Sequence, residues 1–135
     1  MPYEILDHTA DVEIRFYGSS IQELLASFTE AWANLTLFSL KDSSVHIYAG
    51  EIPFENYTDM LYRFASLFIE QLEVDNFYIN ELRSASISSS GTLSYEIGGF
   101  LFSEVSGYSN IPKAPTYHQI FFDPEKGYGQ IIFDL

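Results

Sequence analysis

Apolar residues recur at two different periods along this chain, and the order of those periods limits the folds that it can adopt. Spacings of three and four residues run through two stretches, Ile21 to Leu35 and Tyr57 to Leu72, which predicts two amphipathic helices. Alternation of apolar and polar residues predicts strands elsewhere. Several strands in direct succession favour antiparallel pairing over parallel crossovers. We therefore predict an α+β fold, a two-layer sandwich with two helices packed on one face of a mostly antiparallel or mixed sheet.

The ends of the predicted helices are marked by capping residues. Ser20 and Glu23 have the spacing of a capping box before the first helix. Asn56 or Thr58 is available as the N-cap of the second helix, which should end near residues 75–76. The strands that we predict are residues 12–17, 45–49, 77–87, 93–97, 117–122 and 128–133.

Turn and loop residues separate these strands. Residues 88–91 and 123–127 carry the turn signals of two hairpins. Gly98 and Gly99 interrupt a strand and indicate a bulge. The segment 103–115 is rich in serine and contains two prolines, so we predict a long loop there, of the kind that often carries function.

The length and apolar content suit one domain spanning residues 1–135. A chain of 135 residues, 47% of them hydrophobic, can bury a sufficient core without disulfides, and it contains no cysteine. The first eight residues lack the basic start and apolar stretch of an export signal, and no run approaches the ~20 apolar residues of a membrane helix. We expect a soluble cytoplasmic protein with no membrane partner.

The charge of the chain disfavours nucleic acid as a direct partner. Six Lys and Arg against nineteen Asp and Glu give a formal charge of −13. Such a charge repels the phosphate backbone, so direct nucleic-acid binding is not expected. It attracts cations and basic proteins, such as an enzyme whose own active site handles nucleic acid. The alternative is that the acidity only aids solubility.

Two groups of carboxylates lie far apart in the sequence. Asp7 and Asp11 flank His8 just before the first predicted strand, where a turn can direct several oxygen atoms to one point. The last predicted strand is apolar and runs into Asp134 and Leu135. Gathered carboxylates are relieved most simply by a hard divalent cation such as calcium, magnesium or manganese. The alternatives are that the first group caps a turn and that the second is a frayed end.

A third candidate segment contains one of the few basic residues. Lys113 precedes Tyr117 and His118 at the beginning of a predicted strand. A lysine beside an acidic site can hold a carboxylate of a partner or a phosphate. Equally, Lys113 can be a solvated loop residue, with Tyr117 half-buried and His118 facing outward.

These three segments together resemble the archease family. The run YEILDHTADVEIRFY, residues 3–17, is similar to the archease opening, in which His-Thr-Ala-Asp leads into the first strand. Residues 113–118 resemble the Lys, two variable positions, Thr-Tyr-His element of the family, and residues 133–135 resemble its ending. The three elements follow the order and distances of the family across the whole chain.

The resemblance implies a site and a function. Archeases are known as non-enzymatic cofactors of the RtcB-type tRNA-splicing RNA ligase, whose guanylylation and turnover they promote. By resemblance, Asp11 and Asp134 would supply carboxylate oxygens to a calcium-type cation, and Leu135 a main-chain or terminal oxygen. Lys113 would act beside that site. We add His8, Tyr117 and His118 as candidates for activating the partner.

The chain also departs from the family pattern. Asn34, Phe38 and residues 66–67 stand in regions where many members carry acidic residues, with Asp42 as the nearest acidic substitute. Gly98 and Gly99 replace a usual Gly-Glu pair. Contributions of these regions to a cation site are therefore not expected by resemblance.

Two other functions fit parts of the sequence. One is a chaperone-like modulator of tRNA-modifying enzymes such as methyltransferases, which differs from the first only in its partner. The other is a metal-dependent phosphoesterase with Asp7, Asp11 and Asp134 holding the ion and His8 or His118 as general base. Against an enzyme, the sequence has no nucleophile elbow or phosphate-binding glycine loop, and few cations to neutralise a phosphate.

Overall fold

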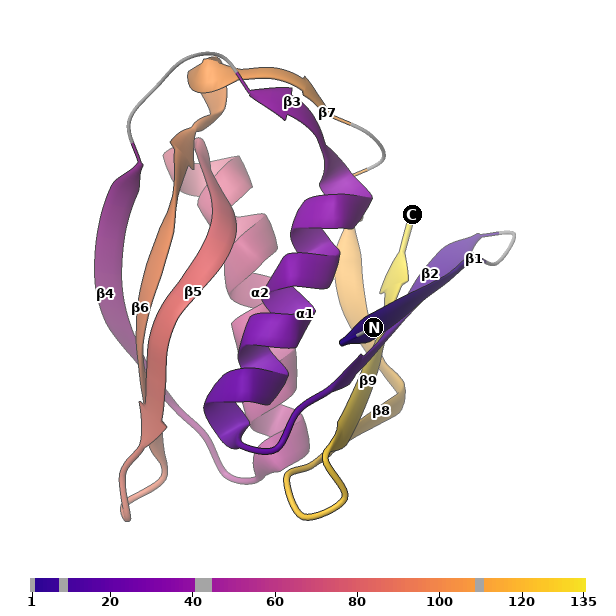
Figure 1. Ribbon diagram of the computed structural model, residues 1–135, viewed down its shortest axis with the longest axis vertical. Coiled ribbons are helices and arrows are strands. Elements are labelled where there is room, and N and C mark those ends of the chain that lie inside the picture. Colours follow the sequence, from indigo (N-terminus) through magenta and orange to yellow (C-terminus); the bar gives the residue numbers. More distant parts are fainter. Residues whose placement is uncertain (1, 8–9, 41–44, 109–110) are drawn as a thin grey trace.

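The computed structural model describes residues 2–7, 10–40, 45–108 and 111–135 (Figure 1). Two helices, nine strands and one 3-10 turn are present within these ranges. In chain order they are β1 (Tyr3–Asp7), β2 (Asp11–Tyr17), α1 (Ile21–Thr36), β3 (Leu37–Leu40), β4 (His46–Pro53), α2 (Tyr57–Asp75), β5 (Phe77–Ile87), β6 (Thr92–Leu101), η1 (Phe102–Glu104), β7 (Val105–Tyr108), β8 (Ala114–Asp123) and β9 (Tyr128–Asp134).

The strands form two main sheets with the helices between them. One sheet has the order β1-β2-β9-β8 and the other β4-β6-β5, while β3 and β7 pair separately. Every described pair is antiparallel. Figure 1 shows both helices between the two sheets, and each helix contacts strands of both. The α+β class and the antiparallel pairing are confirmed.

The division into two sheets, rather than the single predicted sheet, follows from the helices. The buried residues of α1 extend around more than half of its circumference. They include Leu25, Phe28, Thr29 and Trp32. A helix with so wide a buried surface needs cover from more than one side, and β2 and β5 provide it from different sheets.

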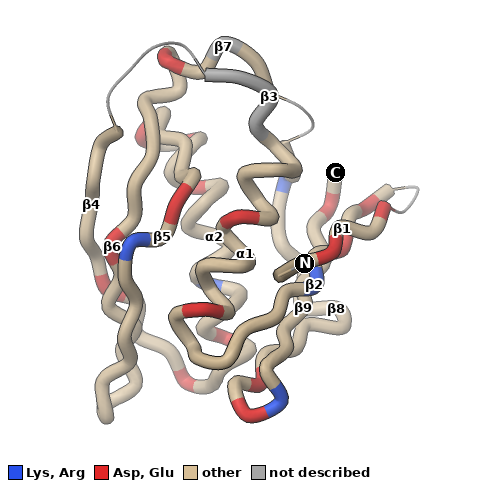
Figure 2. Tube along the Cα trace, in the orientation of Figure 1, with Lys and Arg blue, Asp and Glu red and all other residues tan. Residues whose placement is uncertain are grey.

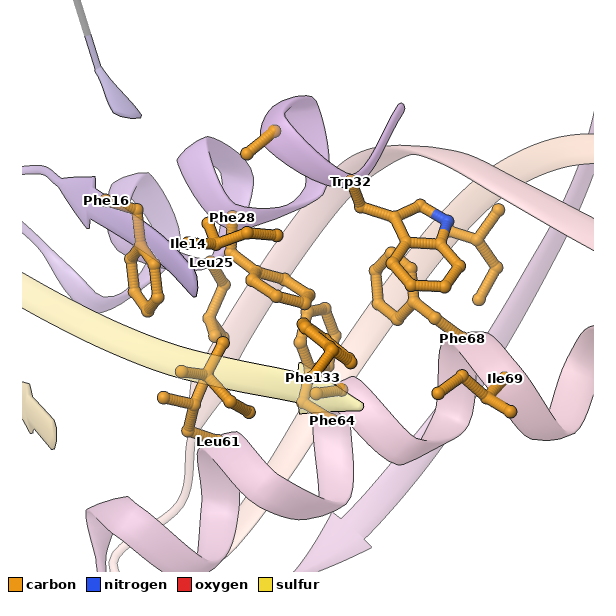
Figure 3. Close-up of a cluster of buried hydrophobic side chains, with 14 of the residues drawn as sticks. Ile14, Phe16, Leu25, Phe28, Trp32, Leu61, Phe64, Phe68, Ile69 and Phe133 are labelled. Atoms are coloured by element: carbon orange, nitrogen blue, oxygen red, sulfur yellow. The ribbon is translucent and has the colours of Figure 1, made fainter. Parts of the chain in front are cut away.

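Aromatic side chains fill the space between the sheets (Figure 3). Phe28 and Trp32 of α1 lie at the centre, with ring centroids 5.3 Å and 5.5 Å from that of Phe68 of α2. Phe133 of β9 closes the cluster, 6.1 Å from Phe28 and 5.8 Å from Trp32. The end of the last strand is therefore anchored in the core.

The predicted ends of α2 are confirmed. Asn56 is the N-cap, and its side chain accepts a hydrogen bond of 2.8 Å from the Asp59 amide. Asn76 follows the helix with a left-handed φ of 52°, and its amide donates to the carbonyl of Gln71. No described helix is long and apolar enough to cross a membrane.

Both predicted hairpins are present, and so is the bulge. β5 and β6 meet at the turn of residues 88–91, and β8 and β9 at the turn after Asp123. The register shifts between Ile79 and Glu81, which face Gly99 and Gly98. A β-carbon on Gly99 would lie 2.0 Å from the Tyr78 carbonyl oxygen, so glycine permits the close approach of the two strands.

Three strands were not predicted. β1 pairs with β2, and β3 pairs with β7. β7 and the beginning of β8 lie inside the segment 103–115, so the prediction of one long loop is wrong at these residues. The cause is long-range pairing: β7 is stabilised as a strand by β3, more than 60 residues earlier, and local alternation does not reveal this.

Candidate cation site at the ends of β2 and β9

The pairing of β2 with β9 brings the two distant carboxylates together. Asp11 lies directly opposite Asp134 in the antiparallel register. Ala114 of β8 lies opposite Asp134 on the other side. Residues directly opposite one another have β-carbons about 5 Å apart and point to the same face of a sheet. The pairing of β2 with β9 therefore places two carboxylates side by side at one end of the sheet.

Backbone contacts fix this arrangement. The amide of Lys113 donates to the carbonyl oxygen of Asp134 at 2.8 Å, and the amide of Leu135 donates to that of Ala10 at 3.3 Å. One position along the strands, Val12 and Phe133 are fully buried on the opposite face. Because these two side chains are held in the core, the alternation of the strands turns Asp11 and Asp134 away from it.

The environment of the pair differs between its two members. Oδ1 of Asp11 is buried and, within the described part of the chain, has no hydrogen-bond partner. Asp134 is exposed. Leu135 is partly buried and packs against the core. A buried carboxylate oxygen without a donor, beside a second carboxylate, is an unfavourable arrangement that a bound cation would relieve.

Two further oxygen-bearing residues lie on the same face of these strands. Glu13 is 4% exposed, and its Oε2 accepts a hydrogen bond of 2.5 Å from Nε of Arg15. This hydrogen bond and the charge of Glu13 raise the pKa of Arg15. Thr116, opposite Ile132, has a buried hydroxyl with no partner among the described residues. We did not select Glu13 or Thr116 from the sequence. The two-residue spacing from Asp11 to Glu13 does indicate that these two side chains share a face of the strand.

The remaining candidate residues are less closely associated with the Asp11–Asp134 pair. Lys113 is exposed, with its backbone beside Asp134. Tyr117 is 57% exposed and stacks on Tyr62 of α2, with ring centroids 3.9 Å apart. His118 is exposed in the part of β8 where the register with β9 is irregular. His8 lies outside the described residues, as does Asp42.

The available donors suit a hard cation. The described residues contain no group of three or more His, Asp or Glu side chains arranged to hold a metal ion. A cation here would therefore combine the carboxylates of Asp11 and Asp134 with main-chain oxygen, such as that of Leu135. All of these donors are oxygen atoms, which calcium, magnesium and manganese prefer. The residues present fit such an ion.

Comparison with known proteins identifies the family of the chain. The model of the Archease protein family (MTH1598/TM1083) matches residues 3–135. The chain is 34% identical to a protein named archease from Thermoplasma volcanium, over the whole of both chains. It is 33% identical to the archease of Thermoplasma acidophilum, over the whole of this chain and 94% of the relative.

A solved structure supports the fold. The solution structure of Methanobacterium thermoautotrophicum protein 1598 superimposes with a TM-score of 0.66, at 20% identity and over 99% of each chain. At that identity the likeness concerns the arrangement of helices and strands. The match of the family model over residues 3–135 and the relatives at 33% and 34% identity show that this chain belongs to the archease family.

Proposed function

We propose that this protein is a non-enzymatic activator of an RtcB-type tRNA-splicing RNA ligase in the cytoplasm, and that it acts through a divalent cation, calcium in the first place, held by Asp11, Asp134 and main-chain oxygen of Leu135. Membership of the archease family supports the choice of partner. The cation is suggested by the chemistry of the site itself.

One observation carries the cation site. Asp11 and Asp134 are directly opposite one another, and Oδ1 of Asp11 is buried without a partner in the described structure. A buried unsatisfied carboxylate oxygen costs free energy, and a like charge on the neighbouring strand adds to that cost. A fold that keeps both groups at this place gains if a cation binds there. When bound, the ion would neutralise the pair and offer a positive centre to oxygen atoms of a partner.

The charge of the chain supports a basic protein partner. Figure 2 shows acidic positions distributed over both sheets and both helices, with few basic ones. The formal charge of −13 attracts a partner whose active site is positive because it binds RNA. The same charge opposes direct contact with the RNA. The protein would then reach the ligase, and Lys113 beside Asp134 would meet an acidic group or a phosphate there.

A reconstituted ligase assay tests the function. Adding the protein to a cognate RtcB-type ligase should increase guanylylation and multiple-turnover joining, and Asp134→Asn should remove most of the increase. Glu125→Gln is the matched control, because it neutralises an exposed carboxylate in the turn between β8 and β9. No stimulation by the unmodified protein would contradict the proposed function, and equal stimulation by both variants would contradict the role of Asp134.

Calcium binding is measured separately by calorimetry. The unmodified protein should bind calcium, and Asp11→Asn and Asp134→Asn should each weaken binding strongly, while Glu125→Gln should not. Binding that is independent of both aspartates would place the ion elsewhere.

The alternative partner and the alternative chemistry have their own outcomes. A pull-down from native cells that recovers a tRNA methyltransferase and no ligase would favour a chaperone-like modulator of tRNA-modifying enzymes. Hydrolysis of a generic phosphoester by the purified protein, lost in Asp11→Asn, would instead favour a phosphoesterase.

A further inference from the structure

The edge of β4 differs from the other sheet edges in the described structure, because its blocking residues, Glu51 and Pro53, stand near its C-terminal end and leave the stretch before them open. β4 is an outer strand of its sheet, and its register with β6 runs without interruption from His46 to Pro53. It has no lysine or arginine. Ile47 and Tyr48 are about half exposed, 49% and 51%. Unbroken, apolar edges offer free backbone donors and acceptors to another strand, and proteins usually block them.

The opposite edge of the same sheet shows what such protection looks like. β5 has two register shifts along its pairing with β6. Arg83 stands in this strand and forms ion pairs of 3.3 Å with Glu81 and Glu96. The amide of Ala85 donates to the side chain of Gln22 of α1 at 3.2 Å. Bulges, charges and a capping side chain thus close the β5 edge.

The outer strands of the other sheet are also irregular or short. β8 loses its register with β9 between Thr116 and Phe121, and Gln119 has a left-handed φ of 56°. The carbonyl oxygen of Gln119 accepts a hydrogen bond from Gln130. β1 contains five residues. β4 is therefore the long regular edge that this fold leaves open in its described part.

A groove runs beside the open edge. One pocket of about 530 Å³ is lined by Glu51 of β4, Tyr62, Ser66 and Glu70 of α2, Tyr95 of β6 and Tyr117 of β8. A second pocket of about 410 Å³ shares Tyr95 with the first and is also lined by Tyr48 and Ala49 of β4, and we refer to the two pockets together as the groove. A β-carbon on Gly50 would lie 2.3 Å from the Tyr95 hydroxyl, so this ring lies against the middle of β4.

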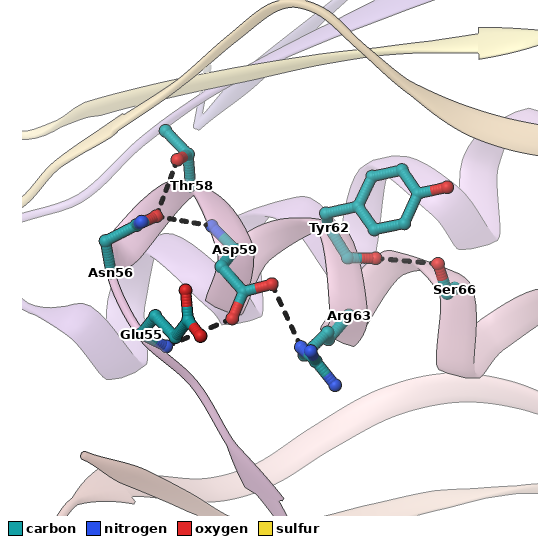
Figure 4. A network of polar contacts seen from close by, with 7 residues as sticks. All are labelled: Glu55, Asn56, Thr58, Asp59, Tyr62, Arg63 and Ser66. Atoms are coloured by element: carbon teal, nitrogen blue, oxygen red, sulfur yellow. Dashed lines mark hydrogen bonds and ion pairs between the residues drawn. The ribbon is translucent and has the colours of Figure 1, made fainter.

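The groove is acidic and aromatic. Burial, and then the negative charge of Glu70, raise the pKa of Tyr95, which places this carboxylate near the Tyr95 hydroxyl. Arg63 also lines the first pocket, but its guanidinium is bound to Asp59 at 2.9 Å (Figure 4). Asp75 lines the second pocket. Stacked tyrosine faces beside carboxylates that form no ion pair with another described residue suit an alkylammonium or guanidinium group.

We propose that the β4 edge and this groove are a docking surface for an extended, basic segment of a partner protein. The segment adds to β4 as a strand, as in other cases of β-augmentation, and its Lys or Arg side chains lie against Tyr62, Tyr117 and Glu70. A second copy of this chain fits the surface poorly, since two chains of charge −13 repel one another. The surface shares no residue with the Asp11 and Asp134 pair, so it can be tested without the ligase.

A synthetic peptide that alternates lysine with valine is the probe. By NMR it should shift the amide signals of residues 46–53 and slow their hydrogen exchange, and its affinity should fall with added salt. The same peptide with glutamate in place of lysine should bind at least about tenfold more weakly, a difference of about 1.4 kcal/mol. A copy with N-methylated backbone amides should also lose binding, because it cannot complete a strand ladder. Equal affinity for the lysine and glutamate peptides would overturn the proposal.

Paired variants separate the groove from the overall charge. Glu70→Lys and Glu73→Lys make the same change on α2, but only Glu70 lines the groove, so only the first should weaken binding about tenfold or more. Ile47→Lys should act likewise, and Ser86→Lys on the closed β5 edge should not. Equal effects within each pair would contradict the proposal. So would a dimer in sedimentation analysis that Ile47→Lys dissociates, because the occupant would then be a second copy.

Discussion

The pairs Val12–Phe133 and Asp11–Asp134 stand one residue apart on the same two strands, yet their environments are opposite. Val12 and Phe133 are fully buried between the sheets. Asp11 and Asp134 face the other way: Asp11 has a buried oxygen with no partner in the described ranges, and Asp134 is exposed. The strand period of two thus places a stabilising pair next to a destabilising pair. The Val12–Phe133 pair holds β2 and β9 in the core. The Asp11–Asp134 pair does not stabilise the fold, so we look for its role in function.

A buried pair of hydroxyls elsewhere in the core is satisfied by hydrogen bonds, unlike the Asp11 oxygen. The Tyr78 hydroxyl and Oγ1 of Thr36 are 2.7 Å apart, and Thr36 also donates to the carbonyl of Trp32 at 2.7 Å. Buried polar groups in proteins are nearly always paired in this way. Among the residues that the structure describes, Oδ1 of Asp11 has no such partner. Nε1 of Trp32, Oδ1 of Asn80 and the Thr116 hydroxyl also lack one there, but the Asp11 atom is the carboxylate oxygen of this set, opposite a second carboxylate, which is why we propose a cation as its partner.

The largest expected loss of stability comes from the buried Val12–Phe133 pair. Phe133→Ala should reduce the free energy of unfolding by about 3–5 kcal/mol, because it leaves a cavity between Phe28 and Trp32. Urea denaturation followed by tryptophan fluorescence measures the change. A loss below about 1 kcal/mol would show that the two faces of β9 do not differ as the structure implies.

The second largest effect is expected from alkaline pH, which should destabilise the folded protein through the buried hydroxyl of Tyr78. Burial raises the pKa of Tyr78 to about 12, from 10.0 in the unfolded chain. The stabilisation is fully present below pH 10 and is lost as pH rises through 12, because the unfolded state then releases its proton first. The loss from this group should reach about 3 kcal/mol. Stability measured across this range should fall less steeply in Tyr78→Phe, and identical slopes would contradict the effect.

Most of the fold was predictable from local pattern. Both helices, the N-cap at Asn56, the two hairpins and the bulge opposite Gly98 and Gly99 follow from periodicity, capping and turn residues. β3 and β7 were not predictable in this way, because each becomes a strand by pairing with the other across a long stretch of chain. The second sheet was missed for the related reason that the full width of the buried surface of α1 becomes visible only in three dimensions.

The site was predictable in part. The carboxylates at both ends of the chain were identified, but only the register of β2 with β9 shows that Asp11 and Asp134 are opposite. Glu13 was missed because a glutamate in an amphipathic strand ordinarily faces water, whereas here it is buried and paired with Arg15. Tyr117 was selected with the site, yet its ring lies on α2, and this depends on how β8 packs.

Overpacking of the inner face should have an intermediate effect. Gly129 faces Phe16 across the strands, and a β-carbon there would lie 2.4 Å from the Phe16 ring. Gly129→Ala should therefore cost about 1–3 kcal/mol, since a buried ring must move. Gly50→Ala also meets a ring, that of Tyr95, but at the open edge of β4, and should cost less. Thermal melts of the two variants provide the comparison, and a larger loss in Gly50→Ala would reverse it.

The smallest change in stability is expected at the Asp11–Asp134 pair. Without divalent ions, Asp11→Asn should alter the free energy of unfolding by about 0.5 kcal/mol or less, or raise it slightly, because it removes a like charge from beside Asp134. Calcium at about ten times its dissociation constant should stabilise the unmodified protein by about 1.4 kcal/mol and leave the variant unchanged. Melts with and without EDTA measure both effects. A large loss of stability in Asp11→Asn without calcium would mean that Asp11 itself stabilises the fold. It would contradict the conclusion that only the buried face of β2 contributes to stability.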